Sequence, residues 1–327
     1  MNRLQLTLAL GDYDHTRDVA LGMVRPDGIE IVWLNLPVEE IFFRFTRYRE
    51  WDVTELSFGK YVALRSQGDA SIVALPVFPS RVFRLSSIYV RGDGPVAKPG
   101  DLRGKRIGVP EWAQTAAIYS RGYIAHKLGI PLAEIDWVQA GVNEAGRVEK
   151  VALQLPPGVR LRPVPDKTLD RMLLDGELDA VLSARAPRSF AEGSVVRLYP
   201  DYREAEEAYF RKTGVFPIMH VLALRREVLD RDPWVAMNLV KAFEEARRRS
   251  LARLSDVTAS HAPLAWTGDY VARLRRIFGD DPFPYGLEPN RRTLEAFLRY
   301  AFEQGVCHRE LTPEELFPPQ VLTSFKV

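Results

Sequence analysis

Hydrophobic and polar residues alternate at the start of the chain, and this pattern predicts a β-strand over residues 4–10 that ends at a Gly-Asp turn. A helix is expected from about 14 to 23, and a second strand from 29 to 34. A strand, a helix and a strand in this order favour a parallel sheet, because two parallel strands need a crossover connection between them.

The next elements lead to a segment that contains two prolines. The pattern predicts a helix over 37–48, a strand over 51–57 and a strand over 71–75. Residues 76–84 then hold two prolines and two arginines. Proline fixes φ and removes a backbone donor, so we interpret this segment as a stiff crossover between two domains, facing an anionic ligand. An ordinary surface loop is the competing interpretation.

A second set of alternating elements begins near residue 86. Strands are expected at 86–90, 107–109, 135–139 and, after a turn, within 175–184, and helices at 113–128 and 168–174. An apolar strand at 216–224 leads into the last third, which is mostly helical. The expected amphipathic helices are 233–254, 267–277 and 290–304.

Length and composition agree with two lobes, because 327 residues exceed what one hydrophobic core usually serves. Hydrophobic residues make up 46% of the chain, and the formal charge of +2 lacks the basic footprint of a nucleic-acid-binding protein. No stretch has the ~18 apolar residues of a membrane span, and no secretory signal is recognisable, so a cytoplasmic location is expected. Cys307 is the only cysteine, which excludes an intramolecular disulfide, and is expected to be a small buried side chain.

Seven short motifs are spread along the chain, and together they are more specific than any one alone. They are Gly-Asp-Tyr-Asp (11–14), Glu-Glu-Ile-Phe-Phe-Arg (39–44), Pro-Val-Phe-Pro-Ser-Arg (76–81), Gly-Lys-Arg-Ile-Gly-Val-Pro-Glu (104–111), Gly-Arg-Val-Glu-Lys (146–150), Phe-Pro-Ile-Met-His (216–220) and Pro-Tyr-Gly (284–286). Through these motifs the chain resembles the 4,5-dihydroxyphthalate decarboxylase family.

The resemblance implies an α/β, two-lobed type II periplasmic-binding-protein-like fold with a helical C-terminal region. Lobe 1 would comprise residues 1–82 and 195–327, lobe 2 would comprise 83–194, and a ligand cleft would lie between them. The implied activity is that of a carboxy-lyase, which decarboxylates a hydroxylated aromatic dicarboxylate without oxidation, such as 4,5-dihydroxyphthalate to 3,4-dihydroxybenzoate. A homo-oligomer is also implied.

The sequence leaves two questions open, namely whether the protein catalyses a reaction and which ring it acts on. A solute-binding protein could hold an aromatic or anionic small molecule in the same cleft without changing it, because fold does not determine function. The resemblance implies a histidine after the Phe-Arg pair at residues 83–84, where this chain has Leu85. A related ring as substrate, or loss of the reaction, is therefore an alternative.

The candidate catalytic residues are His220, Asp14 and Glu55. Ligands of open α/β sheets bind beyond the carboxyl ends of the strands, which directs attention to the loops and strand ends there. Decarboxylation of a hydroxylated ring needs one acid and one base, and an imidazole with a pKa near 6.5 suits either role. For His220 the alternative is a core histidine with satisfied hydrogen bonds.

The candidate substrate-binding residues are basic or hydroxyl-bearing. Arg81, Arg84 and Arg147 could pair with a carboxylate through charge-assisted hydrogen bonds. Thr115 lies at the start of the helix over 113–128, where free backbone N–H groups favour an anion. The further candidates are Tyr13, His15, Ser80 and Arg185.

The cofactor is expected to be none or a divalent metal ion. Histidine and carboxylate side chains are ordinary metal ligands, yet no compact ligand spacing such as His-x-x-x-His occurs in the sequence. Arg121 lies on a different helix face from Thr115 and is expected to be structural.

Overall fold

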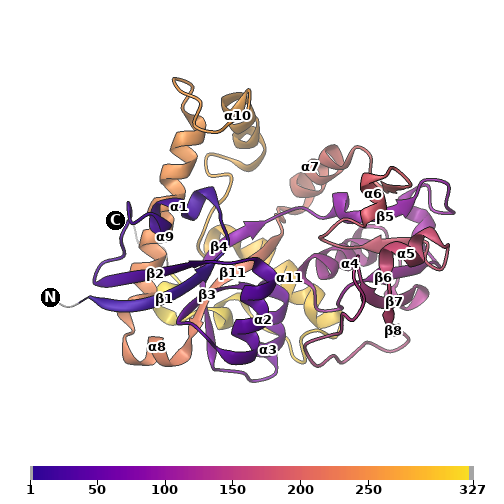
Figure 1. The fold of residues 1–327 in the computed structure, drawn as a ribbon, viewed down its shortest axis with the longest axis horizontal. Helices are drawn as coiled ribbons and strands as arrows, with labels where there is room; N and C mark the ends of the chain where they lie inside the picture. Colours follow the sequence, from indigo (N-terminus) through magenta and orange to yellow (C-terminus); the bar gives the residue numbers. More distant parts are fainter. Residues whose placement is uncertain (1–2, 324–327) are drawn as a thin grey trace.

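The computed structural model describes residues 3–323 and shows two α/β lobes (Figure 1). The first lobe holds a sheet in the order β2-β1-β3-β11-β4, and the second holds one in the order β10-β5-β9-β6-β7-β8. The first sheet is formed by β1 (Leu4–Leu10), β2 (Ile29–Asn35), β3 (Val53–Ser57), β4 (Ile72–Arg81) and β11 (Ile218–Arg225). The second is formed by β5 (Ile88–Arg91), β6 (Arg106–Val109), β7 (Asp136–Gly141), β8 (Arg160–Thr168), β9 (Ala180–Leu182) and β10 (Val195–Arg197). The predicted two-lobed α/β architecture is confirmed.

Helices cover both sheets. They are α1 (Arg17–Ala20), α2 (Val38–Tyr48), α3 (Phe58–Ser66), α4 (Thr115–Lys127), α5 (Leu169–Leu174), α6 (Arg188–Ala191), α7 (Tyr202–Thr213), α8 (Arg226–Arg231), α9 (Trp234–Ser255), α10 (Thr267–Phe278) and α11 (Arg291–Glu303). Single 3₁₀ turns are η1 (Asp14–Thr16), η2 (Leu85–Ser87), η3 (Pro99–Leu102), η4 (Leu132–Glu134), η5 (Glu288–Asn290), η6 (Pro313–Leu316) and η7 (Pro319–Val321). The helix expected over 14–23 is therefore only η1 followed by the short α1.

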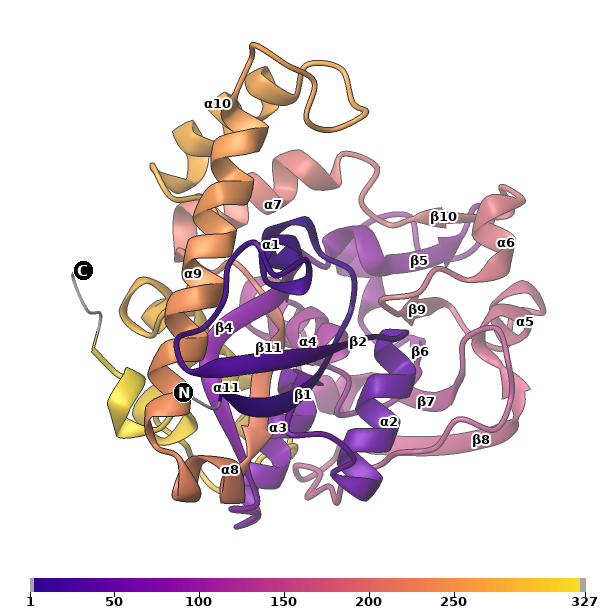
Figure 2. The same ribbon diagram turned by 60° about the vertical axis from the view of Figure 1, so that its left-hand side comes forward.

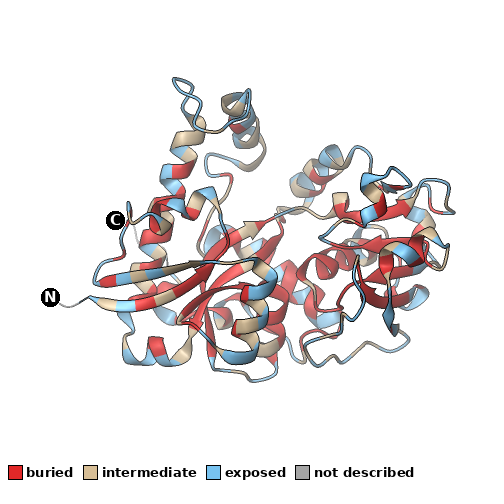
Figure 3. Ribbon diagram, in the orientation of Figure 1, coloured by how far each residue is buried: buried red, intermediate tan, exposed pale blue. Residues whose placement is uncertain are grey.

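The inner strands of both sheets are mostly buried, whereas the edge strands β2 and β8 each have a single buried residue (Figure 3). Strand β1 pairs in parallel with β2 and β3, as the order of elements predicted, whereas β11 runs antiparallel between β3 and β4. Helix α9 packs against β4 and α1 (Figure 2). A returning antiparallel strand in an otherwise parallel sheet puts the start of β11 at the same edge as the carboxyl ends of β1 and β3.

The expected proline crossover is instead part of a strand. Strand β4 continues through Pro76 and Pro79 as far as Arg81. This is possible because both prolines lie between Leu75 and Ser80, where the pairing with β11 is interrupted, and because β4 is the last strand of its sheet. The pairing of β4 with β11 is irregular on both sides of His220. The actual crossover is the short segment after Arg81, which passes through η2 into β5.

The chain returns to the first lobe later than predicted. Residues 195–197 form β10, which pairs with β5 in the second sheet, so the return lies beyond Arg197 and not at 195. Residues 1–2 and 324–327 of the predicted first lobe lie outside the described residues.

The C-terminal region also contacts the second lobe. Helix α11 packs against both α3 and α4. Gln304, just after α11, accepts a hydrogen bond from Arg121 Nε at 2.8 Å, and its backbone oxygen accepts one from Trp112 Nε1 at 2.8 Å. The Arg121 guanidinium is fully buried 3.7 Å from the centre of the Trp112 ring. Its predicted structural role is confirmed.

Helices α9 and α10 project from the first lobe as a hairpin (Figures 1 and 2). This hairpin carries exposed apolar side chains, among them Val257, Leu264 and Trp266, whose exposed fraction is 81%. The predicted homo-oligomer stays a prediction. None of the helices within residues 3–323 is both long enough and apolar enough to cross a membrane.

Candidate active site

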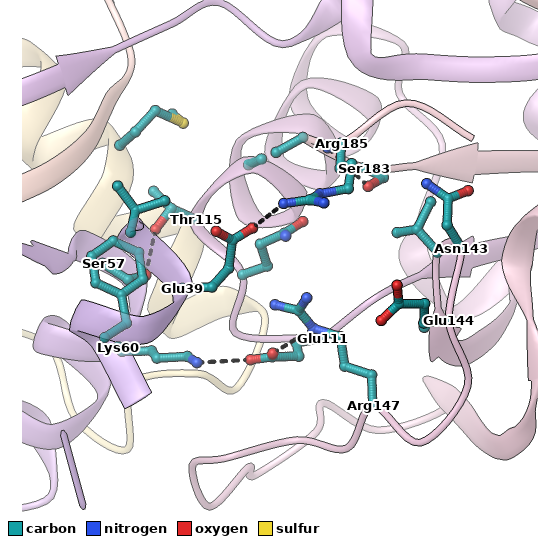
Figure 4. A pocket seen from close by; sticks show the side chains of 18 of the residues that line it. Glu39, Ser57, Lys60, Glu111, Thr115, Asn143, Glu144, Arg147, Ser183 and Arg185 are labelled. Atoms are coloured by element: carbon teal, nitrogen blue, oxygen red, sulfur yellow. Dashed lines mark hydrogen bonds and ion pairs between the residues drawn. The ribbon is translucent and has the colours of Figure 1, made fainter. Parts of the chain in front are cut away.

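A cavity of about 840 Å³ lies between the lobes and is lined by α2, α3 and the start of β11 on one side and by loops of the second lobe on the other. These loops follow β6, β7 and β9 at their carboxyl ends. The cavity therefore occupies the position at which open α/β sheets bind ligands. Figure 4 shows its polar side chains pointing toward one another from both lobes.

The strand register places the candidate residues of the first lobe on one face of the sheet. His220 of β11 stands opposite Ser57 of β3 and opposite Ser80 of β4. Glu55 lies two residues before Ser57, so alternation along the strand directs both side chains to the same face. Glu55, Ser57, Ser80 and His220 thus form a polar row on this sheet.

Glu55 and His220 form a close pair at the base of the cavity. The exposed fraction of the Glu55 side chain is 0%, and its Oε1 lies 2.5 Å from His220 Nδ1. Burial raises the pKa of Glu55, but the His220 imidazole, the Tyr13 hydroxyl and the Gly11 amide outweigh burial and hold this pKa below its usual value. An ionised carboxylate only accepts hydrogen bonds, so His220 carries a proton on Nδ1. No residue within 3–323 forms a hydrogen bond with its Nε2, which can therefore meet a ligand.

Tyr13 completes this group. Its hydroxyl donates to Glu55 Oε1 at 2.6 Å and lies 3.5 Å from His220 Nδ1, while the Gly11 amide donates to Glu55 Oε2 at 3.0 Å. Burial and the neighbouring Glu55 charge raise the pKa of Tyr13, whereas a hydrogen bond with Ser80 lowers it. Tyr13 therefore stays neutral and donates. Phe42 packs edge-on against His220, with ring centres 4.9 Å apart, and fixes the plane of the imidazole.

Asp14 and His15 follow Tyr13 but do not reach the cavity. Asp14 Oδ2 accepts a hydrogen bond from Ser250 Oγ at 2.5 Å, so its side chain points to α9. The His15 ring packs among aromatic rings, 5.0 Å from that of Phe283, and its Nε2 is buried without a partner among the described residues. Burial lowers the pKa of His15 to about 4. Neither residue lines the cavity.

The two arginines near the crossover occupy different places. Arg81 is buried inside the first lobe, where it donates to the backbone oxygens of Phe216 at 2.9 Å and Pro284 at 3.2 Å. The structure does not bring Arg81 to the cavity, which Arg84 does line. Arg84 donates to the sulfur of Met219 at 3.0 Å and makes no ion pair with any described residue, and burial lowers its pKa to about 10.

Thr115 joins the two lobes at the floor of the cavity. Its Oγ1 accepts a hydrogen bond from the Gly59 amide at 2.9 Å and lies 3.1 Å from Ser57 Oγ (Figure 4). Thr115 is the first residue of α4, as expected, but its hydroxyl is already engaged by the first lobe. The start of α4 is therefore held against the start of α3.

A cluster of opposite charges lies beside this junction. The Glu111 side chain is 1% exposed and contacts Lys60 Nζ at 2.9 Å, Arg147 Nε at 2.7 Å and Lys150 Nζ at 3.5 Å. Burial alone raises the pKa of Glu111, but these cations hold it below its usual range. The predicted residue Arg147 lines the cavity within this cluster.

Arg185 reaches across the cavity. Its Nη2 donates to Glu39 Oε1 at 2.6 Å, so a residue that follows β9 in the second lobe is paired with one from α2 in the first (Figure 4). Both side chains line the cavity and are more than half exposed. Arg185, which the sequence predicted to bind substrate, thus lines the cavity and is already paired with the Glu39 carboxylate.

Leu85 lies outside the cavity. Its side chain is 4% exposed at the crossover, and its backbone N–H donates to Glu206 Oε1 at 2.9 Å. Its neighbours there include the aromatic side chains of Tyr119, Tyr123 and Tyr209. The position at which the resemblance implies a histidine therefore lies at the crossover between the lobes.

Sequence reasoning missed Lys60, Glu39, Asn143 and Glu144 as cavity residues. Lys60 belongs to α3, which has no amphipathic stripe because seven of its nine residues are buried. One signal was present, namely a single lysine in an apolar run directly after a strand. Within residues 3–323, no group of three or more His, Cys, Asp or Glu side chains could hold a metal ion.

The fold with its cavity defines the class of type II periplasmic-binding-protein-like proteins. The periplasmic aliphatic sulphonate binding protein SsuA from Escherichia coli is similar with a TM-score of 0.56 at 12% identity, over 98% of this chain and 99% of that one. A Candida albicans gene product with the generic periplasmic binding protein fold is similar with a TM-score of 0.53 at 10% identity, over 100% and 99% of the two chains. At such low identities these likenesses establish the fold alone.

The sequence comparisons establish the family. A 4,5-dihydroxyphthalate decarboxylase from Comamonas testosteroni is 40% identical over 330 residues, which cover 100% of both chains. A protein of the same name from Pseudomonas putida is 41% identical over 214 residues, which cover 64% of this chain and 83% of that one. No family model matches the chain. The chain belongs to the 4,5-dihydroxyphthalate decarboxylase family.

Proposed function

We propose that this protein is a carboxy-lyase that converts 4,5-dihydroxyphthalate, or a close analogue, to 3,4-dihydroxybenzoate and carbon dioxide. The observation that carries the proposal is the Glu55–His220 pair at the wall of a cavity, in a chain that is 40% identical along its whole length to a protein named for this reaction. The ligand is a small aromatic carboxylate, and the cavity of about 840 Å³ is large enough for one ring with four substituents.

Three arginines at the cavity suit the two carboxylates of this substrate. Arg84 makes no ion pair with a described residue, so its guanidinium is available to a carboxylate. Arg147 and Arg185 contact Glu111 and Glu39 through one nitrogen each and keep further N–H donors for a ligand. A charged ring in a partly buried site needs such pairing, because an unpaired carboxylate is costly to remove from water.

His220 is the base of the reaction. Its free Nε2 can take the proton of the ring hydroxyl that lies para to the departing carboxylate, which pushes electron density toward the carbon that bears this carboxylate. Glu55 fixes the orientation of the imidazole and stabilises the imidazolium that forms, since the carboxylate stays ionised at 2.5 Å. After carbon dioxide has left, His220 returns the proton to the ring oxygen.

The first experiment measures carbon dioxide release and the ultraviolet spectrum of 4,5-dihydroxyphthalate with chelator-treated protein, and repeats it with added divalent metal. Turnover without metal establishes both the reaction and its independence from metal, and turnover only with metal establishes a metal-dependent lyase. Binding of the substrate without turnover in either case would instead support the solute-binding alternative.

The His220→Asn variant separates catalysis from binding. Asparagine can still bond to Glu55 but cannot take a proton, so kcat is expected to fall by about 10² to 10⁴, the usual contribution of a general base. Substrate binding, followed by thermal shift or calorimetry, is expected to persist. His308→Asn, at a half-buried position outside the cavity, is the control and is expected to keep full activity. Undiminished turnover by His220→Asn would contradict the assignment of His220 as the base.

A further inference from the structure

The proposed reaction needs a second proton-transfer group, and His220 supplies only one. The carbon that loses carbon dioxide must gain a proton, while the ring hydroxyl gives one to the base. Asp14 and His15 do not line the cavity, and Glu55 is buried behind His220. The acid must therefore be another side chain at the cavity wall.

Most of the ionisable side chains at the wall are poor proton donors. The pKa values of Glu39 and Glu111 are held below their usual range despite burial, so both are ionised and have no proton to give. The guanidinium groups of Arg84, Arg147 and Arg185 keep their protons and suit carboxylate binding. Glu144 is exposed and makes no hydrogen bond with any described residue that would orient it.

Lys60 has the geometry of a donor. It lies in the first turn of α3, three residues after Ser57, and its side chain is 7% exposed yet lines the cavity. Its ammonium group lies 2.9 Å from Glu111 Oε2, which fixes its position (Figure 4). Because Lys60 comes from the first lobe and Glu111 from the second, the ammonium is held in place only while the lobes are together.

The charges around Lys60 allow it to lose a proton. Glu111 also contacts Arg147 at 2.7 Å and Lys150 at 3.5 Å, so the buried carboxylate stays neutralised when Lys60 becomes an uncharged amine. Burial lowers the pKa of Lys60, Lys150 lowers it further, and Glu111 and Glu149 act in the opposite direction, with a net lowering. A buried lysine whose ammonium form is destabilised is a stronger acid than a lysine in water.

We propose that Lys60 is the general acid that protonates the ring carbon, an inference that rests on the proposed decarboxylation. One N–H bond of the ammonium breaks and its proton forms the new C–H bond at the carbon that bears the carboxylate. The bond from this carbon to the carboxylate then breaks, its electron pair restores the aromatic ring, and carbon dioxide leaves. The Lys60 amine regains a proton from solvent.

The Lys60→Arg variant tests this role with charge conserved. A guanidinium can bind a carboxylate and pair with Glu111, but it does not donate its proton at neutral pH. The expected result is a fall in kcat of about 10² to 10⁴ with KM changed by less than about threefold. Lys127→Arg is the matched control, because Lys127 is exposed on α4 and lies away from the cavity, and it is expected to keep wild-type kinetics.

A chemical rescue excludes a purely structural explanation. Lys60→Cys is expected to be inactive and to regain activity after treatment with 2-bromoethylamine, which rebuilds an aminoethyl side chain of lysine length. The only native thiol, Cys307, is buried, and burial raises its pKa to about 12, so the reagent is directed to the introduced thiol. The rebuilt amine is more acidic than that of lysine because of its sulfur, so the alkaline limb of the kcat profile is expected to move to lower pH.

Failure of the proposed decarboxylation and failure of Lys60 as its acid would give different results. Absence of turnover by the wild-type protein with 4,5-dihydroxyphthalate would overturn the proposed function itself. Turnover by the wild type together with an unchanged kcat in Lys60→Arg would overturn the inference alone. A variant that loses kcat, still binds phthalate in a thermal-shift assay and is rescued by aminoethylation would establish Lys60 as the acid. If Lys60→Arg does not fold, the rescued Lys60→Cys protein decides the question by the position of its alkaline limb.

Discussion

Glu55 and His15 lie in neighbouring segments and burial disfavours the charged form of both, but only Glu55 keeps its charge. Glu55 is fully buried but receives hydrogen bonds from Gly11, Tyr13 and His220, and these donors keep it ionised. His15 has a buried ring nitrogen without a partner among residues 3–323, so its neutral form is the stable one. The first arrangement holds a charge at the reaction site, and the second holds an uncharged ring in the core.

The environment of His15 predicts acid sensitivity. Its folded-state pKa of about 4 lies below its ordinary value of 6.5. Between these pH values the unfolded chain binds a proton that the folded chain does not, so the free energy of unfolding falls as the pH falls from 6.5 toward 4. His15→Phe removes this group and keeps an aromatic ring, so its loss of stability between pH 7 and 5 in urea titrations is expected to be smaller.

His308→Gln provides the control for this measurement, since His308 lies near the C-terminal end of the chain, away from the aromatic cluster around His15. It is expected to follow the wild-type profile. Parallel profiles for wild type and His15→Phe between pH 7 and 5 would show that His15 gains its proton in the folded chain as readily as in the unfolded chain.

Among the candidate catalytic residues, the sequence was sufficient only where a strand carried them. Glu55 and His220 lie within predicted strands, so their approach at one edge of the sheet could be anticipated, and the structure brings them together. Asp14 and His15 were selected from the correct loop, but η1 turns them toward α9 and the aromatic cluster. The direction of a side chain in a short 3₁₀ turn depends on tertiary contacts that no local pattern encodes.

At the scale of elements, the site depends on two helix starts that meet. Helix α3 follows β3, helix α4 follows β6 after a short loop, and Gly59 lies at their contact. A β-carbon at Gly59 would lie 2.6 Å from the backbone oxygen of Ala113 and 3.2 Å from Thr115 Oγ1. Only a glycine lets the two lobes approach this closely.

Gly59→Ala is therefore expected to lower the free energy of unfolding by about 1 to 3 kcal/mol, the usual cost of overpacking, because the backbone of Ala113 has to move. Activity is expected to fall as well, since α3 carries Lys60 in the next position. Gly100→Ala is the matched control, because a β-carbon there meets no atom within 4 Å. Equal stability of the two variants in urea titrations would contradict the close contact.

The predicted elements agree with the structure where periodicity was strong, as in α2, α10 and α11. The proline segment was misread because a proline-containing strand is allowed at a sheet edge, and the position of β4 in its sheet follows only from the return of β11. Helix α3 was missed for the opposite reason, since burial on nearly all sides leaves no periodic pattern to detect.

At the scale of the whole molecule, the two lobes contact each other through charges as well as through packing. The Glu39–Arg185 and Lys60–Glu111 pairs each join one lobe to the other across the cavity. The sequence placed Arg185 at the cleft but gave no partner for it, because Glu39 lies 146 residues away along the chain. Glu39 holds Nη2 of Arg185, so a substrate carboxylate that pairs with two nitrogens of this guanidinium would have to displace Glu39.

This competition predicts that Glu39→Gln lowers KM for 4,5-dihydroxyphthalate. Both side chains are more than half exposed, so the pair contributes only about 0.2 to 1 kcal/mol, and KM is expected to fall by roughly 1.5- to 5-fold with kcat little changed. Glu40→Gln is the matched control. Glu40 is the next residue on α2, its carboxylate pairs with Arg44 on the same helix, and it does not line the cavity. A rise in KM for Glu39→Gln would mean that Glu39 itself binds the substrate, through one of the ring hydroxyls, instead of competing with its carboxylate. Steady-state kinetics at low ionic strength, where the ion pair is least screened, gives the clearest difference between the two variants.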